Sequence, residues 1–80
     1  MQLIDDLGSH EPFSETCARR SREAGALSAH ARDIADWLDE HPEILTDSRL
    51  RRQRDNLRLA AHTLDDVRQG LRDAARSAAA

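Results

Sequence analysis

Apolar residues recur along this chain at the spacing of an α-helix, and a polar, proline-containing segment near the middle interrupts them. In the C-terminal half a leucine stands at every seventh position: Leu50, Leu57, Leu64 and Leu71, with Ala78 next in the series. A seven-residue repeat keeps one stripe of a helix apolar along its whole length, so the helix must lie against another helix. The pattern predicts a helix over residues 47–77, with Thr46, Asp47 or Ser48 as its N-cap.

A second helix is predicted over residues 14–40, a stretch without proline in which helix formers dominate. Its apolar positions follow a three-four spacing: Cys17, Ala24, Leu27, Ala31, Ile34 and Leu38. Ser14 is suited to be its N-cap, and His41 ends it because a residue that precedes proline is disfavoured in helical geometry. Residues 42–47 then form a turn, and residues 1–12 form a short N-terminal arm.

Two long helices joined by about six residues can only fold back on each other, so the predicted fold class is all-α, an antiparallel helical hairpin. We expect the two apolar stripes to meet in one seam, with Ile34 opposite Leu57. The predicted seam residues are Leu27, Ile34, Leu50, Leu57, Leu64 and Leu71. Charge favours the same topology, because residues 33–47 hold six acids and no arginine, whereas residues 49–58 hold five arginines.

The chain carries more large apolar side chains than one seam can cover, and Trp37 and Leu59 fall outside both stripes. A single domain of 80 residues buries a small share of its surface, so a lone hairpin is marginally stable. We therefore expect two hairpins to dimerise into a four-helix bundle, with the N-terminal arm packed against it. The alternative is that the uncovered surface receives a different protein.

Composition narrows the setting in which the protein works. The net charge is −3, no uncharged apolar run is long enough to cross a membrane, and no signal segment opens the chain. Cys17 is the only cysteine, which argues against a disulfide framework. We expect a cytoplasmic protein with no membrane partner, no small-molecule substrate and no cofactor, because the sequence contains no motif for binding one.

An arginine-rich face at the start of the second helix supports an alternative function, that of a nucleic-acid-binding regulator. Its residues are Arg49, Arg51, Arg52, Arg54 and Arg58. Such a face can contact the phosphates of structured RNA. The chain as a whole is acidic, however, and these arginines share their heptads with Leu50 and Leu57 instead of forming a free basic region upstream of a zipper.

Metal binding by a helical bundle is a third alternative. The histidines are His10, His30, His41 and His62. His30 stands one helical turn from Asp33, a spacing that can supply two ligands, but neither helix contains the Glu-x-x-His segment of a di-iron bundle. We therefore assign no metal ligand. One face near the turn gathers four side chains that we interpret as an aromatic-edged packing surface: His30, Ile34, Trp37 and His41.

Catalysis has less support than any of these alternatives. Cys17 has basic neighbours that can activate a thiol, but no histidine is close in sequence and the position falls on an apolar stripe. The sequence offers no convergent set of catalytic groups, so we expect no catalytic residue and no enzyme activity.

The function most consistent with this pattern is a non-enzymatic protein–protein interaction module: an adaptor, an assembly subunit or a small regulatory antagonist of a larger complex. Its expected partners are a second copy of itself and an unidentified protein. The side chains outside the seam are the predicted partner-binding surface: Trp37, Leu59, Asp33, Asp36, Glu40 and Glu43.

Overall fold

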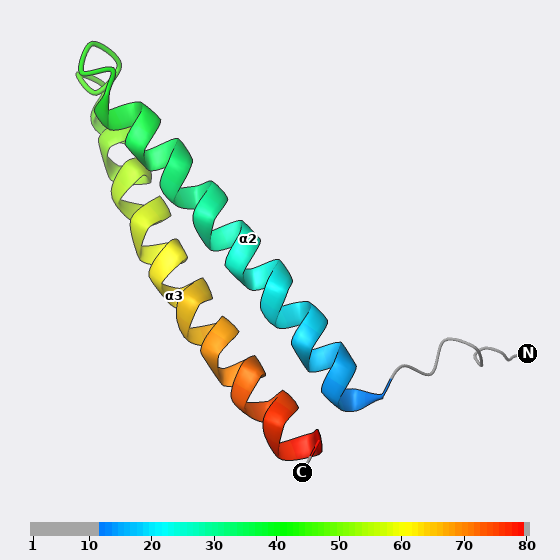
Figure 1. Ribbon diagram of the computed structural model, residues 1–80. Helices are drawn as coiled ribbons and strands as arrows, with labels where there is room; N and C mark the ends of the chain where they lie inside the picture. The colour runs from blue at the N-terminus through cyan, green and yellow to red at the C-terminus, as the bar shows by residue number, and fades with distance from the viewer. Residues whose placement is uncertain (1–11, 80) are drawn as a thin grey trace, which may run out of the picture.

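The computed structural model describes residues 12–79, which form two antiparallel helices that lie side by side (Figure 1). Helix α2 runs over Phe13–Asp39 and helix α3 over Ser48–Ala79. The all-α hairpin is therefore confirmed, with each helix end within two residues of its predicted position. The N-terminal arm that we predicted over residues 1–12 lies outside the described residues, except for Pro12.

The first helix begins without the side-chain cap that we predicted at Ser14. Pro12 stands at the N-cap position, with φ −55° and ψ 145°, and no side chain caps the helix end. Its carbonyl oxygen accepts hydrogen bonds from the backbone N–H of Thr16 at 3.0 Å and from the Thr16 hydroxyl at 3.3 Å. Proline is well tolerated at a helix start because its missing N–H would have no partner there, and so α2 begins one residue before Ser14.

The turn between the helices is closed by local hydrogen bonds and ends at a side-chain cap. The backbone N–H of Glu40 still bonds the Asp36 carbonyl at 3.0 Å, and Pro42 then prevents the helix from continuing. Asp47 Oδ1 accepts the backbone N–H of Arg49 at 2.8 Å and that of Leu50 at 3.4 Å. Of the three predicted caps, Asp47 is thus the one that satisfies the free donors at the start of α3.

The seam between the helices consists mainly of small side chains. The buried residues of α2 are Cys17, Ser21, Ala24, Ser28, Ala35 and Leu38. Ala61 is the buried residue of α3, and Ala35 and Ala61 both have 0% exposure. The Ser21 hydroxyl donates to the Arg68 carbonyl at 3.1 Å, which requires the two backbones to approach closely. Small seam residues permit this approach, because side-chain size at the contact sets the distance between helix axes.

Two of the predicted seam residues lie outside the seam. Leu27 is 57% exposed and Ile34 is 41% exposed, while Leu57 and Leu64 are half-buried at the edge of the seam. The predicted axial alignment is kept, since Ser28 lies beside Ala61. The prediction was wrong about the rotation of each helix about its own axis. The small residues face the other helix, and large residues such as Leu27 and Ile34 lie on one side of the seam instead of in it.

Gly25 lies where a side chain from α3 crosses α2. A Cβ atom at this position would come within 2.9 Å of Arg68 Cδ, so the missing side chain makes room for the arginine stem. We expect Gly25→Ala to raise the free energy of unfolding by less than the gain of about 1 kcal/mol in helix propensity, because the Arg68 stem must shift to make room for the methyl group. Urea denaturation followed by circular dichroism measures the change.

Gly70 provides the matched control for this substitution. It lies in α3, and a Cβ atom there would meet nothing within 4 Å. Gly70→Ala should therefore raise the free energy of unfolding by up to about 1 kcal/mol. Equal stabilisation by Gly25→Ala would show that the Arg68 stem does not need the space.

Candidate interaction surfaces

Ion pairs between the helices line one side of the hairpin, which we call the polar side. It is formed by Arg32, Asp36 and Asp39 of α2 and by Arg54, Arg58 and Asp65 of α3. Arg54 Nη1 lies 2.7 Å from Asp39 Oδ1, and Arg58 bonds both Asp39 and Asp36. The hydrogen bonds from Arg54 and Arg58 lower the pKa of Asp39, and Asp39 in turn raises the pKa of both guanidinium groups. The acidic and basic blocks therefore lie against each other, as the charge distribution predicts.

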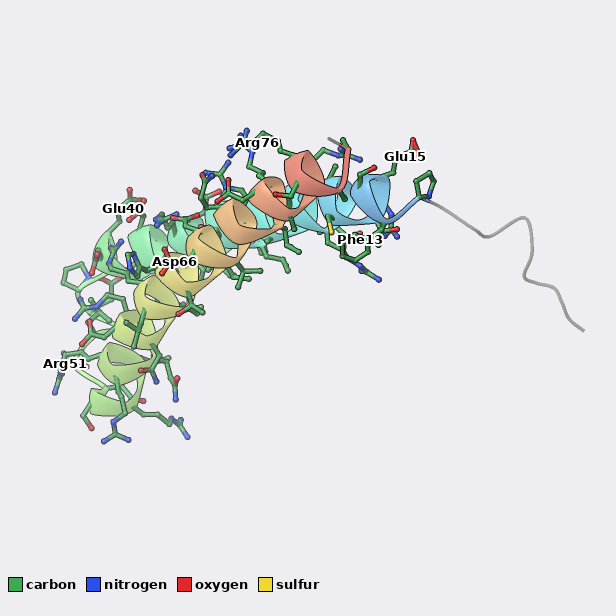
Figure 2. All side chains as sticks on the ribbon, turned by 90° about the horizontal axis from the view of Figure 1, so that it is seen from below. Phe13, Glu15, Glu40, Arg51, Asp66 and Arg76 are labelled. Carbon is green, nitrogen blue, oxygen red and sulfur yellow. The ribbon has the colours of Figure 1, made fainter. Side chains whose placement is uncertain are left out.

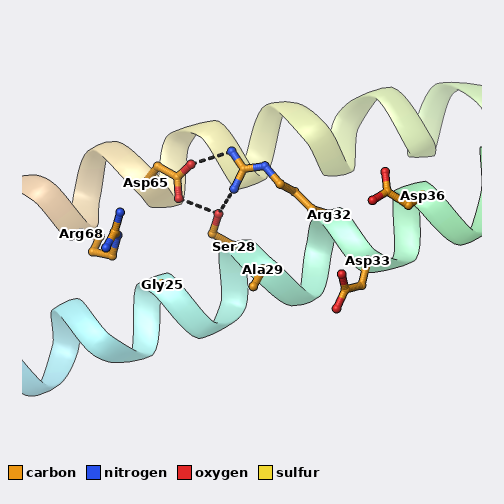
Figure 3. Close-up of a pocket in the computed structure, with 8 residues that line it drawn as sticks. All are labelled: Gly25, Ser28, Ala29, Arg32, Asp33, Asp36, Asp65 and Arg68. Carbon is orange, nitrogen blue, oxygen red and sulfur yellow. Dashed lines mark hydrogen bonds and ion pairs between the residues drawn. The ribbon is translucent and has the colours of Figure 1, made fainter.

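A three-residue network joins the helices halfway along this side (Figure 3). Arg32 Nη2 lies 2.5 Å from Asp65 Oδ2, and Arg32 Nη1 donates to the Ser28 hydroxyl at 2.6 Å. That hydroxyl donates to Asp65 Oδ1 at 2.6 Å and has the Ala61 carbonyl at 3.1 Å as a second acceptor. The network borders an open groove of about 490 Å³, which Gly25, Arg68 and two further carboxylates also line.

The groove lacks the character of a binding site for an anion. Its central guanidinium, on Arg32, is already paired with Asp65, and the carboxylates of Asp33 and Asp36 add negative charge beside it. Arg68 Nε is buried and has no hydrogen-bond partner among residues 12–79. With three carboxylates against two guanidinium groups, the lining of the groove is net negative, although Arg68 Nε remains an unpaired donor among the described residues.

Asp65 makes stability depend on pH in the acidic range. Hydrogen bonds from Arg32 and then from Ser28 lower its pKa from 3.8 to about 2 in the folded chain. Because the folded pKa lies below the unfolded value, the stabilisation is complete above about pH 4 and is lost as the pH falls towards 2. We expect the melting temperature of Asp65→Asn to be lower than that of the parent at pH 7, with the difference shrinking as the pH approaches 2.

Asp66→Asn is the control for this pH series. Asp66 is the neighbouring carboxylate on α3, and it lies 3.7 Å from His62 in the same helix rather than across the seam. The control should melt close to the parent protein throughout the series. A melting temperature of Asp65→Asn that follows the parent at every pH would contradict the role of the network.

Most of the predicted arginine face is occupied by contacts within the hairpin. Besides the pairs of Arg54 and Arg58, Arg51 Nη1 donates to the Leu45 carbonyl at 2.5 Å, and Arg49 Nη2 lies 4.0 Å from Asp47. A nucleic acid would have to displace carboxylates from Arg54 and Arg58 before its phosphates could use them. The face is therefore less positive than its sequence suggests.

The predicted partner-binding residues are divided between the two helices: Asp33, Asp36, Trp37 and Glu40 occupy neighbouring exposed positions at the end of α2, whereas Leu59 lies on α3. Trp37 and Leu59 are both exposed, but they lie on different helices and each is far round its helix from the seam. Asp36 is paired with Arg58 on the polar side. Trp37 instead stacks on His41, with ring centroids 4.1 Å apart, and His41 Nδ1 lies 2.6 Å from the Trp37 carbonyl. Two of the four residues predicted to share a packing surface near the turn are thus in contact.

The opposite side of the hairpin is apolar, and we call it the apolar face. Its residues are Leu27, Ala31 and Ile34 of α2 and Leu57, Ala60, Leu64, Val67 and Leu71 of α3. Three of these side chains are well exposed: Leu27, Ile34 and Val67, of which Val67 is 46% exposed. Ser28 is buried in the seam, and on α2 Arg32 lies to one side of it and Leu27 to the other. The paired charges and the exposed apolar side chains therefore lie on opposite sides of the seam.

Phe13 extends the same helical series to the end of α2. It precedes Leu27 by two heptads, and it is 68% exposed. Figure 2 shows Phe13 and Arg76 on opposite sides of the hairpin. Phe13 therefore places one apolar side chain at the open end of the molecule, separated from Leu27 by Arg20, which is paired with Glu23.

The part of the chain that the structure describes shows neither a metal site nor a membrane-spanning helix. Among residues 12–79, no three histidine, cysteine, aspartate or glutamate side chains gather closely enough to hold a metal ion. Of the two described helices, neither is long and apolar enough to cross a membrane. The chain matches no protein-family model, no curated protein and no solved structure at a significant level. The proposals below therefore depend on the geometry of the hairpin alone.

Proposed function

We propose that this protein is a non-enzymatic helical interaction module, and that it works by protein contact through its apolar face. The main support is the exposure of large apolar side chains on one side of the hairpin, above all Leu27, Ile34 and Val67. Monomeric soluble proteins rarely expose contiguous apolar patches larger than a few hundred Å², and the largest apolar patch is often a contact site. An adaptor, an assembly subunit or a small antagonist of a larger complex all use such a face.

The polar side supports the same proposal by contrast. Its charged groups are paired across the seam, as Arg32 is with Asp65 and Arg54 with Asp39, so they hold the two helices together. Exposed ion pairs of this kind contribute only about 0–1 kcal/mol each, but they fix which faces of the helices meet. The ion pairs between the helices thus lie on one side of the hairpin, and Leu27, Ile34 and Val67 are exposed on the other.

Site-directed photo-crosslinking in cells tests this function. A photoreactive amino acid is placed in turn at Leu27, Ile34 and Val67, and at Leu59, which is 66% exposed but lies away from the apolar face. We expect protein adducts from the first three positions and few from the fourth. Equal adduct yields at Leu59, or no adducts from the apolar face, would overturn the proposal.

A further inference from the structure

We infer that the occupant of the apolar face is a second copy of this chain, docked antiparallel to form a four-helix bundle. The inference rests on the proposed function and names its partner. It states the direction and the register in which the two hairpins associate. The direction and the register follow from how large and small side chains alternate along the apolar face.

The apolar face is built of layers, because the contact between Ser28 and Ala61 fixes which residues of α2 and α3 lie at the same level. By this alignment, Leu27 lies level with Leu64. One step of about 5 Å towards the turn, Ala31 lies level with Ala60. The next step brings Ile34 level with Leu57. Layers of two large side chains thus flank a layer of two small ones.

An antiparallel second copy fits these layers best. A two-fold axis across the hairpin, between the Leu27 and Ala31 layers, places Leu27 and Leu64 against the partner's Ala31 and the partner's Ala60. Each of the two central layers of the bundle then holds two leucines and two alanines. Large side chains fill the space that small ones leave, as close packing requires.

Two hairpins pointing in the same direction fit less well. A two-fold axis parallel to the helices would place Leu27 and Leu64 against the same pair of leucines, giving one layer of four leucines. The next layer would contain four alanines, two from Ala31 and two from Ala60. The first layer would be overpacked and the second would leave a cavity, and both are destabilising.

One ion pair lies at the edge of the apolar face. Arg20 precedes Leu27 by one heptad, its side chain is 60% exposed, and its Nη1 donates to Glu23 Oε1 at 2.8 Å. This pair lies one heptad beyond Leu27, outside the layers of leucine and alanine that decide the direction of the second copy.

The size of the apolar face is sufficient for a dimer. Two helices side by side present a strip about 20 Å wide, and the face with its flanking layers spans about 20 residues, or about 30 Å. The strip has a flat area of about 600 Å², and its accessible area is larger because side chains stand out from it. Specific interfaces bury about 600–1,000 Å² on each partner, so the strip lies at the lower end of this range.

Light scattering of the purified full chain tests the association. We expect a molar mass of twice 9.0 kDa at micromolar concentration. Leu27→Asp should weaken the dimer at least tenfold while leaving the helical content of the hairpin intact, because Leu27 lies outside the seam. Leu59→Asp is the matched control and should leave the molar mass unchanged. A monomer at all concentrations, or a dimer that Leu27→Asp does not weaken, would overturn the inference.

Distances between spin labels test the direction. In a Cys17→Ser background, a label at Glu43→Cys lies beyond Asp39, the end of α2, which is itself about 15 Å from the level of the two-fold axis. The two labels of an antiparallel dimer should therefore be more than about 30 Å apart, and those at Thr63→Cys, close to the axis, less than about 25 Å apart. Short distances at both positions would show hairpins that point the same way and would overturn the antiparallel register.

These results are separable from a failure of the proposed function. A purified chain that is monomeric, but whose apolar face forms adducts with another protein in cells, would leave the proposed function standing and remove the second copy as the partner. A face that yields no adducts in cells would remove the proposed function itself.

Discussion

Ala35→Leu should lower the free energy of unfolding by about 2–3 kcal/mol, the upper part of the range for overpacking a buried site. Ala35 has 0% exposure and lies in the seam, where the helix backbones approach closely enough for serine hydroxyls to reach carbonyl oxygens on the other helix. A leucine can be admitted only by moving the helices apart, which would break those bonds. Urea denaturation followed by circular dichroism, at one fixed protein concentration, measures the loss.

Ala26→Leu is the control for this prediction. The substitution adds the same side chain to the same helix, but Ala26 is exposed and lies away from the seam. We expect its free energy of unfolding to remain within about 0.5 kcal/mol of the parent value. If Ala35→Leu were equally harmless, the close approach of the helices at the seam would be contradicted.

The helices and their antiparallel arrangement could be predicted from the sequence because strong local signals mark them. The heptad of leucines, the proline after His41 and the cap at Asp47 each act over a few residues. The charge blocks also predicted correctly that the neighbourhood of Asp39 meets that of Arg54. Each of these signals depends on spacing or sign, which the sequence states directly.

The rotation of each helix about its axis could not be predicted in the same way. Hydrophobic spacing alone favours Leu27 and Ile34 as seam residues, because large apolar side chains gain most from burial. The structure instead buries Ser21 and Ser28, which are polar but satisfy their hydroxyls on Arg68 and Ala61 of the other helix. The sequence signal for this rotation is the heptad series that Ser21, Ser28 and Ala35 form.

The candidate surface changed as a consequence of this rotation. Once the small residues occupy the seam, Leu27 and Ile34 become part of an exposed face, while Trp37 and Leu59 are left on separate outer surfaces. Gly25 is a further case that depends on this rotation, because the Arg68 stem that lies against it comes from the other helix. A long-range contact of this kind depends on the rotation and cannot be read from local pattern.

The second large effect is expected at Leu57, which belongs both to the edge of the seam and to the apolar face. Leu57→Asp removes a half-buried apolar side chain and puts a charge in its place, at a cost of about 3 kcal/mol or more. A small two-helix domain has little stability in reserve. We therefore expect a large loss of helical content at room temperature, measured by far-ultraviolet circular dichroism.

Leu59→Asp provides the comparison that makes this loss interpretable. Leu59 lies two residues further along α3, is 66% exposed and contributes to neither the seam nor the apolar face. The same change of side chain there should alter the free energy of unfolding by no more than about 0.5 kcal/mol. Since helix propensity and charge change equally in the two variants, a difference between them reports the packing of Leu57, both in the seam and on the apolar face. Equal loss of helix in both variants would show that α3 presents different faces to α2 and to solvent than the structure assigns.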